Sequence, residues 1–249
     1  MDIIQSFTLG NQLLVVLGAF IIGLAKGGLK GIELLNVTIM ALVFGGKLST
    51  GIILPMLCIG DLLAVIYYQR NVKWPLFWKL IIWMALGIII GVYIGQGMAE
   101  IMFKKLLSFI IIVIVIMMIW VETRKNDFLP KSSFFSPIIG LIAGITTMIG
   151  NLAGPFSNLF FMAQKVSKND FIGTAAWVFL AINIFKLPFQ IIYWDNINVN
   201  TLSLNVLLLP ALIAGFYTGT FLVKKIKDES YRKVIIGLTL VGALVIFLK

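Results

Sequence analysis

The amino-acid sequence predicts an all-α polytopic membrane protein with two inverted-topology repeats, each a Gly-rich broken or re-entrant helical segment plus three transmembrane helices. Composition is the first observation: of 249 residues, 60% are hydrophobic and only 12% are charged. A soluble domain of this length does not need so much apolar surface. The second observation is that Gly-rich stretches interrupt two apolar segments. The third is that residues recur in the same order along the two halves.

The first interruption is the stretch 26–31, with the sequence KGGLKG, inside an apolar run between residues 13 and 46. Neither part of this run, 13–25 or 32–44, reaches the roughly 20 residues that a spanning helix needs. The glycines allow the backbone to turn sharply or to adopt positive φ. We therefore expect a broken helix, or a hairpin of two half-helices with its tip at membrane depth. Irregular backbone is tolerated there only where protein buries it or a cavity borders it.

Three apolar segments of spanning length follow in the first half, at 49–68, 76–98 and 101–121. The polar stretch 122–133 is the longest break in this pattern. It predicts a cytoplasmic loop that connects a first repeat, residues 1–121, to a second repeat, residues 134–249.

The second half repeats the pattern of the first. Two apolar segments, 136–149 and 155–163, flank the Gly-rich stretch 150–154, with the sequence GNLAG. Further spans are expected at about 171–193, 202–223 and 234–248. The matching positions include Gly51 with Gly173, Asp61 with Asn183, Asn71 with Asn198, Gly87 with Gly215, Gly91 with Gly219 and Lys104 with Arg232. Their common order along the chain indicates an internal repeat.

The basic residues distinguish inverted from parallel repeats. If each interrupted segment is a hairpin that returns to its starting side, each half crosses the membrane three times, and an odd number inverts the second half. One face then carries thirteen basic residues and the other carries four, whereas four crossings per half would give ten against seven. The positive-inside rule favours the hairpin arrangement, with both termini outside the cell.

Five ionisable residues lie inside apolar segments: Lys26, Lys30, Glu33, Asp61 and Lys186. A buried ammonium without a partner is costly, so partners are expected among these groups. Their formal charges leave one positive charge in excess, which predicts a site for a small anion. The alternative is a structural ion-pair cluster that holds a helix break together. Asp61 could carry a coupling proton or neutralise a lysine, and Glu33 could cap a half-helix or take part in coupling.

Groups at the two breaks would complete an anion site. Half-helices that begin near Gly31 and Gly154 would direct N–H donors and positive dipole ends toward the anion. Transporters with inverted repeats bind substrate near the midplane, between such broken helices. Asn183 lies at the position that matches Asp61, three residues before Lys186 on the same helix face.

The sequence contains no pattern typical of catalysis. It has no histidine and a lone Cys58 in an apolar segment, so neither an internal disulfide nor a metal-ligand cluster is expected. We find no nucleophile–base set or phosphate loop, and expect neither an enzyme nor a cofactor. The formal net charge of +10 is expected from cytoplasmic loops and does not indicate nucleic-acid binding. The expected partners are a small anion and the lipid bilayer, and a homo-oligomer is compatible with the sequence.

Several motifs of this chain resemble the TauE/SafE family of sulfite exporter-like membrane proteins, over roughly residues 10–248. The motifs that carry the resemblance are 23–31, 54–55, 60–61, 68–70 and Trp74 in the first half and 150–155, 168–174 and 183–189 in the second. The last three are similar to the family patterns N-x-A-G-P, K-x-x-F-x-G-T and N-x-x-K-x-P. The stretch 33–36 departs from the family, because many members carry more glycine and then a proline there.

The resemblance implies a secondary transporter that moves small sulfur-containing anions, such as sulfite or sulfonates, across the cell membrane (the inner membrane in bacteria). Together with the broken helices, it selects as expected substrate-binding residues Lys26, Lys30, Gly31, Asn151, Gly154, Asn183 and Lys186. Asp61 and Glu33 are expected to serve coupling or charge balance. The alternative functions are an uncoupled anion channel and a membrane subunit that delivers a sulfur compound to a partner enzyme.

Overall fold

The computed structural model describes residues 8–123 and 135–247, and all regular structure in these ranges is helical. In chain order the helices are α2 (Leu9–Lys26), α3 (Glu33–Phe44), α4 (Gly46–Tyr68), η1 (Gln69–Asn71), α5 (Trp74–Gly95), α6 (Glu100–Thr123), α7 (Phe135–Gly150), α8 (Ala153–Ala163), α9 (Lys168–Pro188), η2 (Phe189–Tyr193), α10 (Val199–Lys225) and α11 (Asp228–Phe247).

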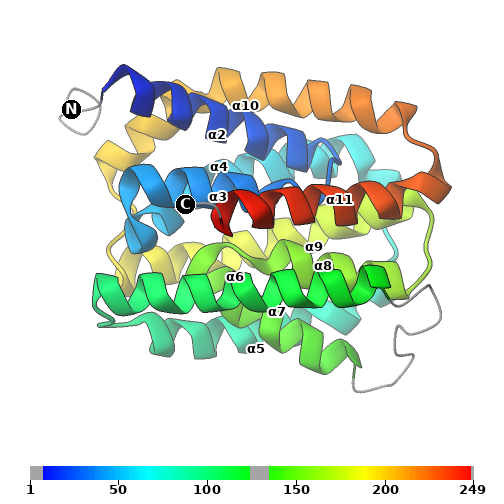
Figure 1. Ribbon diagram of the computed structural model, residues 1–249, viewed down its shortest axis with the longest axis horizontal. Coiled ribbons are helices and arrows are strands. Elements are labelled where there is room, and N and C mark those ends of the chain that lie inside the picture. The colour runs from blue at the N-terminus through cyan, green and yellow to red at the C-terminus, as the bar shows by residue number, and fades with distance from the viewer. Residues whose placement is uncertain (1–7, 124–134, 248–249) are drawn as a thin grey trace.

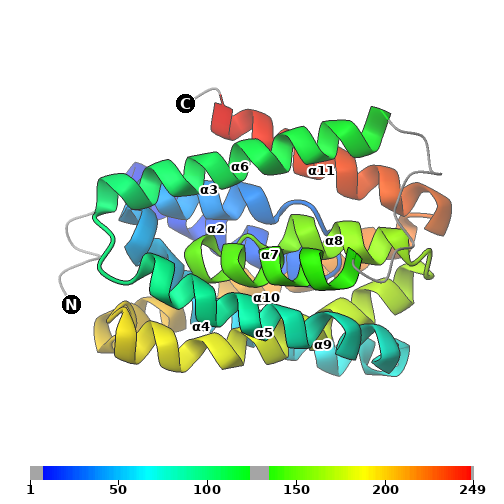
Figure 2. The same cartoon turned by 90° about the horizontal axis from the view of Figure 1, so that it is seen from below.

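Many of these helices have the length and composition of membrane spans. Among the described residues, five segments are long and apolar enough to cross a bilayer: Leu9–Lys26, Gly46–Asn71, Trp74–Gly95, Lys168–Tyr193 and Val199–Lys225. Helices α6 and α11 have 24 and 20 residues and also reach spanning length. The long helices lie side by side along one direction (Figures 1 and 2).

The two Gly-rich stretches form the turns of two helical hairpins. Helices α2 and α3 lie antiparallel on either side of residues 27–32, and α7 and α8 are joined in the same way by residues 151–152 (Figure 1). The first five residues of the first turn are buried. Gly28 and Gly31 have φ values of 115° and 99°, which glycine adopts without a Cβ clash. Asn151 forms the second turn at φ 56°, a conformation that asparagine tolerates better than most residues.

The connections between helices gather at two ends of the bundle. The α4–α5, α8–α9 and α10–α11 connections lie at one end, and the α3–α4, α5–α6 and α9–α10 connections lie at the other (Figure 1). At the first end, Lys168 at the beginning of α9 forms an ion pair with Asp228 at the beginning of α11, with 3.5 Å between Nζ and Oδ1. The connections there and the adjoining helix ends also contain Arg70, Lys73, Lys165, Lys224, Lys225, Lys227, Arg232 and Lys233. We name this the basic end.

Glycines bring two pairs of helices into backbone contact. Helix α2 packs on α10, where a Cβ on Gly23 or on Gly215 would overlap backbone atoms of the facing helix. Helix α5 packs on α7, where Gly87 and Gly144 meet in the same way. Small residues permit this close approach between membrane helices. Each interface joins a helix of the first half to a helix of the second half.

Several helices begin before the apolar segments that the sequence predicted. Helix α11 begins at Asp228 instead of 234, and α9 begins at Lys168 instead of 171. Hydropathy marks only the apolar part of a helix, whereas polar residues start it: the Ser167 side chain accepts a hydrogen bond at the N-terminus of α9. The predicted connecting loop, 122–133, lies outside the described residues from 124 onward.

Candidate functional site

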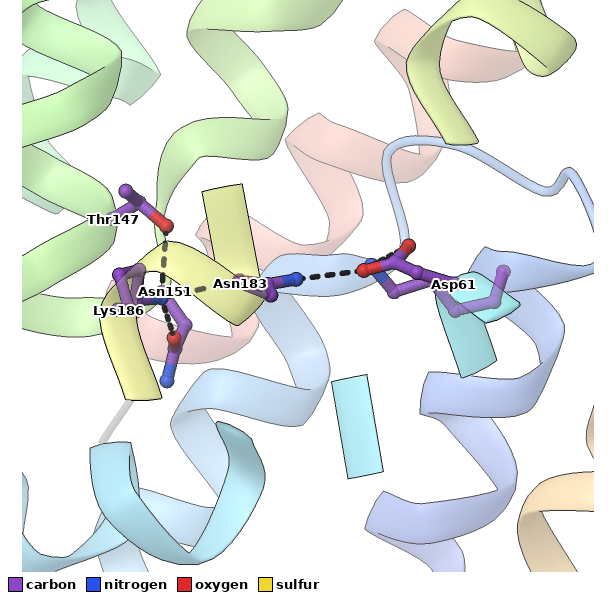
Figure 3. Close-up of polar contacts among 6 residues, drawn as sticks. Asp61, Thr147, Asn151, Asn183 and Lys186 are labelled. Atoms are coloured by element: carbon purple, nitrogen blue, oxygen red, sulfur yellow. Dashed lines mark hydrogen bonds and ion pairs between the residues drawn. The ribbon is translucent and has the colours of Figure 1, made fainter. Parts of the chain in front are cut away.

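A series of hydrogen-bonded side chains connects α2, α4 and α9 inside the bundle (Figure 3). Lys26 Nζ, at the end of α2, lies 2.6 Å from Asp61 Oδ1 on α4. Asn183 Nδ2 on α9 donates to Asp61 Oδ2 at 2.7 Å, and Lys186 Nζ donates to Asn183 Oδ1 at 3.3 Å. Asp61 is 0% exposed and Lys26 is 5% exposed. The ion pair is therefore buried, with both carboxylate oxygens satisfied.

Lys186 extends this series to the second hairpin. Its ammonium donates to Thr147 Oγ1 at 3.1 Å and to Asn151 Oδ1 at 2.5 Å (Figure 3). Asn151 Nδ2 in turn donates to the carbonyl oxygen of Thr50 on α4 at 3.1 Å. Lys186 is 0% exposed, and these partners are all neutral oxygens. Helix α9 ends at Pro188 and is followed directly by the π-helix η2. Proline has no backbone N–H to donate and therefore interrupts the α-helical hydrogen bonds at this point.

Lys30 lies in the turn of the first hairpin and is 2% exposed. Its ammonium lies 5.4 Å from the centre of the Phe179 ring on α9, and the Lys26 ammonium lies 5.0 Å from the same centre. Such a cation–π contact contributes only about 0.5–2 kcal/mol. Among the described residues, no carboxylate forms an ion pair with Lys30 or Lys186. Both therefore bury a positive charge without a contacting negative one.

Glu33 caps the first hairpin. Its Oε2 accepts a hydrogen bond from the backbone N–H of Gly31 at 2.5 Å, and a carboxylate in the first turn of α3 also interacts favourably with the helix dipole. Gly31 itself packs on α11, where a Cβ would overlap the carbonyl oxygen of Ile235. Gly154 on α8 faces Glu33, since a Cβ there would lie 3.4 Å from the carboxyl carbon. The carboxylate of Glu33 thus contacts both breaks.

A small cavity, which we name the central cavity, lies between the two hairpins. Its volume is about 40 Å³. The expected site residues that line it are Lys26, Glu33, Asn151, Gly154 and Asn183. Thr147 and Phe179 also line it. The structure thus brings the two breaks and α9 together around one cavity, while Lys30, Asp61 and Lys186 lie beside it through contacts with its lining residues.

Two tyrosines hold the first turn in place, and the sequence analysis predicted this role for neither. Tyr68 Oη at the end of α4 donates to the carbonyl oxygen of Gly27 at 2.9 Å. Tyr231 Oη on α11 donates to the carbonyl oxygen of Gly28 at 2.5 Å. These partners are 41 and 203 positions apart in the chain, and no local pattern connects them.

Sequence analysis also missed two residues that line the central cavity, although each carried a signal. Phe179 lies four residues before Asn183, and Thr147 lies four residues before Asn151. Residues four apart on a helix share a face, so this spacing could have placed each of these side chains beside a candidate site residue. Their aromatic and hydroxyl groups did not by themselves indicate an anion site.

The arrangement suits a small oxyanion. Two buried ammonium groups lie without contacting carboxylates, and amide and hydroxyl groups lie close to them. Charged donors of this kind bind oxyanions with short, strong hydrogen bonds. Within the searched part of the chain, no group of three or more His, Cys, Asp or Glu residues could hold a metal ion.

The fold and this cluster define a class of protein: a polytopic α-helical membrane protein with a buried, net cationic site between two helical hairpins. The family model described as sulfite exporter TauE/SafE matches residues 15–246, and the chain belongs to that family. This match confirms the resemblance found in the motifs, and makes the chain a multi-pass membrane protein of a transporter family. Searches of curated proteins and of solved structures found no match.

Proposed function

We propose that this protein is a secondary transporter that carries a small sulfur-containing oxyanion, of the sulfite or sulfonate class, through the central cavity by alternating access. The observation that carries the proposal is the excess of buried cations: Lys30 and Lys186 lie beside the cavity without a contacting carboxylate. An anion bound in the cavity would supply the missing negative charge. Family membership supports the sulfur-containing class.

The size of the cavity supports a compact substrate. One water molecule needs roughly 10–15 Å³ of such space. The central cavity, at about 40 Å³, therefore has room for only a few heavy atoms. We assign this structure to an occluded state, from which rearrangement of the hairpins would open the cavity toward one side or the other.

In this proposal the two halves are inverted repeats that move against each other. Three observations support it. Each half supplies one hairpin to the central cavity, each hairpin packs its first helix on a long helix of the other half, and Asp61 bonds to Asn183 at the matching position. The positive-inside rule then places the basic end in the cytoplasm and both termini outside the cell.

We assign Asp61 to charge balance in this mechanism. Its carboxylate is 0% exposed, pairs with Lys26 at 2.6 Å and accepts a second hydrogen bond from Asn183. This carboxylate supplies the opposite charge that the buried Lys26 ammonium requires. It therefore neutralises Lys26 and leaves Lys30 and Lys186 for the substrate.

Thermal stabilisation of the purified protein tests the site. We expect one sulfur oxyanion from a panel of sulfite, thiosulfate, sulfate, sulfoacetate and taurine to raise the melting temperature selectively, and acetate not to, because a ligand that binds only the folded state stabilises it. Lys30→Met should abolish this shift. Lys47→Met is the matched control, since Lys47 also lies over an aromatic ring, 5.5 Å from the centre of Trp194, but at the opposite end from the basic end. An unchanged shift in Lys30→Met would contradict the proposed site.

Counterflow in proteoliposomes tests the mechanism. A transporter that alternates access exchanges labelled for unlabelled anion and saturates as the anion concentration rises. A large single-channel conductance without saturable exchange would contradict alternating access and support an uncoupled anion channel.

A further inference from the structure

A larger pocket lies at the basic end of the bundle, between the end of α8 and the beginnings of α9 and α11. Its volume is about 310 Å³. Three of its lining residues are basic and one is acidic: Lys165, Lys168, Arg232 and Asp228. Lys168 is already engaged by Asp228 and by the carbonyl oxygen of Ile226. Lys165 is exposed. The pocket therefore presents net positive charge to the solution.

Three aromatic rings separate this pocket from the interior. Phe161, Phe171 and Tyr231 line it and are all buried. The ring centres of Phe161 and Phe171 are 5.1 Å apart, and those of Phe171 and Tyr231 are 5.7 Å apart. Tyr231 also donates its hydroxyl hydrogen bond to Gly28. One of the three residues that line the pocket with aromatic rings, Tyr231, is thus hydrogen-bonded to the turn that carries Lys30.

One face of α8 connects this pocket with the central cavity. Gly154 lines the cavity, and Phe161, about two turns later, lines the pocket. Ser157 and Asn158 lie between them, three and four residues after Gly154. These spacings place both residues on the same helix face as Gly154 and Phe161. Figure 2 shows α8 running through the middle of the bundle toward the connections at the basic end.

The two polar residues on this face, Ser157 and Asn158, are buried without hydrogen-bond partners among the described residues. Ser157 and Asn158 are both 0% exposed. The Ser157 hydroxyl and both polar atoms of the Asn158 amide have no partner in the part of the chain that the structure describes. Buried polar side chains are nearly always hydrogen-bonded, so three orphan atoms on one face need an explanation. A hydrated anion that passes along this face would satisfy them.

We propose that the pocket at the basic end is an anion-binding vestibule, and that the anion passes between it and the central cavity along the Ser157 and Asn158 face of α8. This inference rests on the proposed function and takes the same ligand class, a small sulfur-containing oxyanion. Phe161, Phe171 and Tyr231 close the route in this structure. Opening it separates Tyr231 from Gly28, so the turn that carries Lys30 is released as the route opens.

Cysteine labelling tests the route. In a Cys58→Ala background, which removes the chain's one cysteine, Ser157→Cys and Asn158→Cys are exposed to the anionic thiol reagent 2-sulfonatoethyl methanethiosulfonate. The reagent is added to inverted vesicles and, separately, to right-side-out vesicles. Leu159→Cys is the matched control, because Leu159 is equally buried on α8, 4% exposed, but lies on its other side. We expect labelling of the first two cysteines in inverted vesicles only, faster after Phe161→Ala, and no labelling of the control.

Two outcomes overturn the route. The first is that neither Ser157→Cys nor Asn158→Cys is labelled, even when combined with Phe161→Ala, although thermal unfolding shows that these variants are folded. The other is equal labelling of all three cysteines. If the sulfur anion still stabilises the protein in a Lys30-dependent way, the proposed function stands and only the route fails. If the two cysteines are labelled but no anion stabilises the protein, the proposed substrate site fails instead.

A charge comparison tests the vestibule. Lys165→Met should raise the transport KM several-fold at low ionic strength with kcat unchanged, because a rim charge acts mainly on the association rate. Lys224→Met is the control: it lies in a neighbouring pocket of the same volume, about 310 Å³, which shares Lys168 with the vestibule but contains no residue of α8. Equal effects of the two substitutions would mean that general surface charge attracts the anion, and would contradict a vestibule at Lys165.

Discussion

The two hairpins share one architecture but acquire their charge in different ways. The first turn contains Lys30 and is flanked by Lys26 and Glu33. The second turn consists of Asn151 and Leu152, and the cation that contacts it is Lys186 on α9. The turn region of the first hairpin therefore contains charged residues of its own, whereas the second turn is neutral and binds a charged side chain of another helix.

This difference explains how each turn is held. The charged first turn depends on groups from distant helices: the Asp61 carboxylate pairs with Lys26, and the hydroxyls of Tyr68 and Tyr231 bind its backbone carbonyls. The neutral second turn is held by two side chains of its own hairpin: Asn151, which bonds in two directions, and Thr146, whose hydroxyl donates to the carbonyl oxygen of Leu152 at 3.4 Å. Charge in a membrane interior is costly unless it is paired, so the charged turn needs the larger number of partners.

The largest expected effect comes from removal of the partner of the charged turn. Asp61→Leu leaves Lys26 buried without its carboxylate, which should cost about 3–5 kcal/mol of stability. The measurement is the melting temperature and the yield of monodisperse protein. The double variant Lys26→Met/Asp61→Leu should recover most of the loss. If Asp61→Leu is as stable as the parent, the ion pair does not hold the first hairpin.

A smaller effect is expected when the neutral turn is given a charge. Asn151→Asp keeps the shape and the left-handed backbone of the turn but pairs Lys186 with a carboxylate. Because the new carboxylate pairs with Lys186 but loses the Nδ2 donor to the carbonyl oxygen of Thr50, we expect little net change in thermal stability without anion and about tenfold weaker anion binding, which corresponds to ~1.4 kcal/mol. Asn198→Asp is the control, because aspartate caps α10 as well as asparagine does. Undiminished anion binding in Asn151→Asp would show that Lys186 does not face the substrate.

The glycine interfaces test whether the two hairpins are anchored equally. Gly215→Ala pushes α10 from α2, and Gly87→Ala pushes α5 from α7, because each new Cβ meets a backbone oxygen. Overpacking of this kind costs typically ~1–3 kcal/mol. Gly237→Ala in α11 is the control, since its Cβ would enter open space. Equal losses for the first two would indicate equivalent anchors, whereas a loss in only one would mean that the halves are held differently.

The smallest expected effect concerns the cap of the first hairpin. Glu33→Gln keeps an oxygen that accepts the hydrogen bond from Gly31, and it loses only the interaction of the charge with the helix dipole, about 0.3–1 kcal/mol. We expect a small fall in melting temperature and the same response of transport to an imposed proton gradient as in the parent protein. Loss of that dependence would assign Glu33 to coupling.

Much of the fold was predictable because it depends on local chemistry. A run of apolar residues specifies a membrane helix, and glycine and lysine within 26–31 specify where that helix stops. The second break followed from the Gly-rich stretch 150–154 between two apolar segments, and the family followed from motifs around Asn151, Asn183 and Lys186. The ends of the helices were less predictable, because polar caps such as Ser167 lie outside the hydropathy signal.

The sequence by itself determined that the chain is a membrane protein with two broken segments and one excess intramembrane cation, since these follow from composition and spacing. Only the tertiary structure decided which groups meet: that Asp61 pairs with Lys26 and not with Lys30, and that Phe179 lies beside both lysines. These contacts join helices far apart in the chain, and their distances depend on how the helices pack. That packing leaves two ammonium groups, Lys30 and Lys186, without a contacting carboxylate beside the cavity.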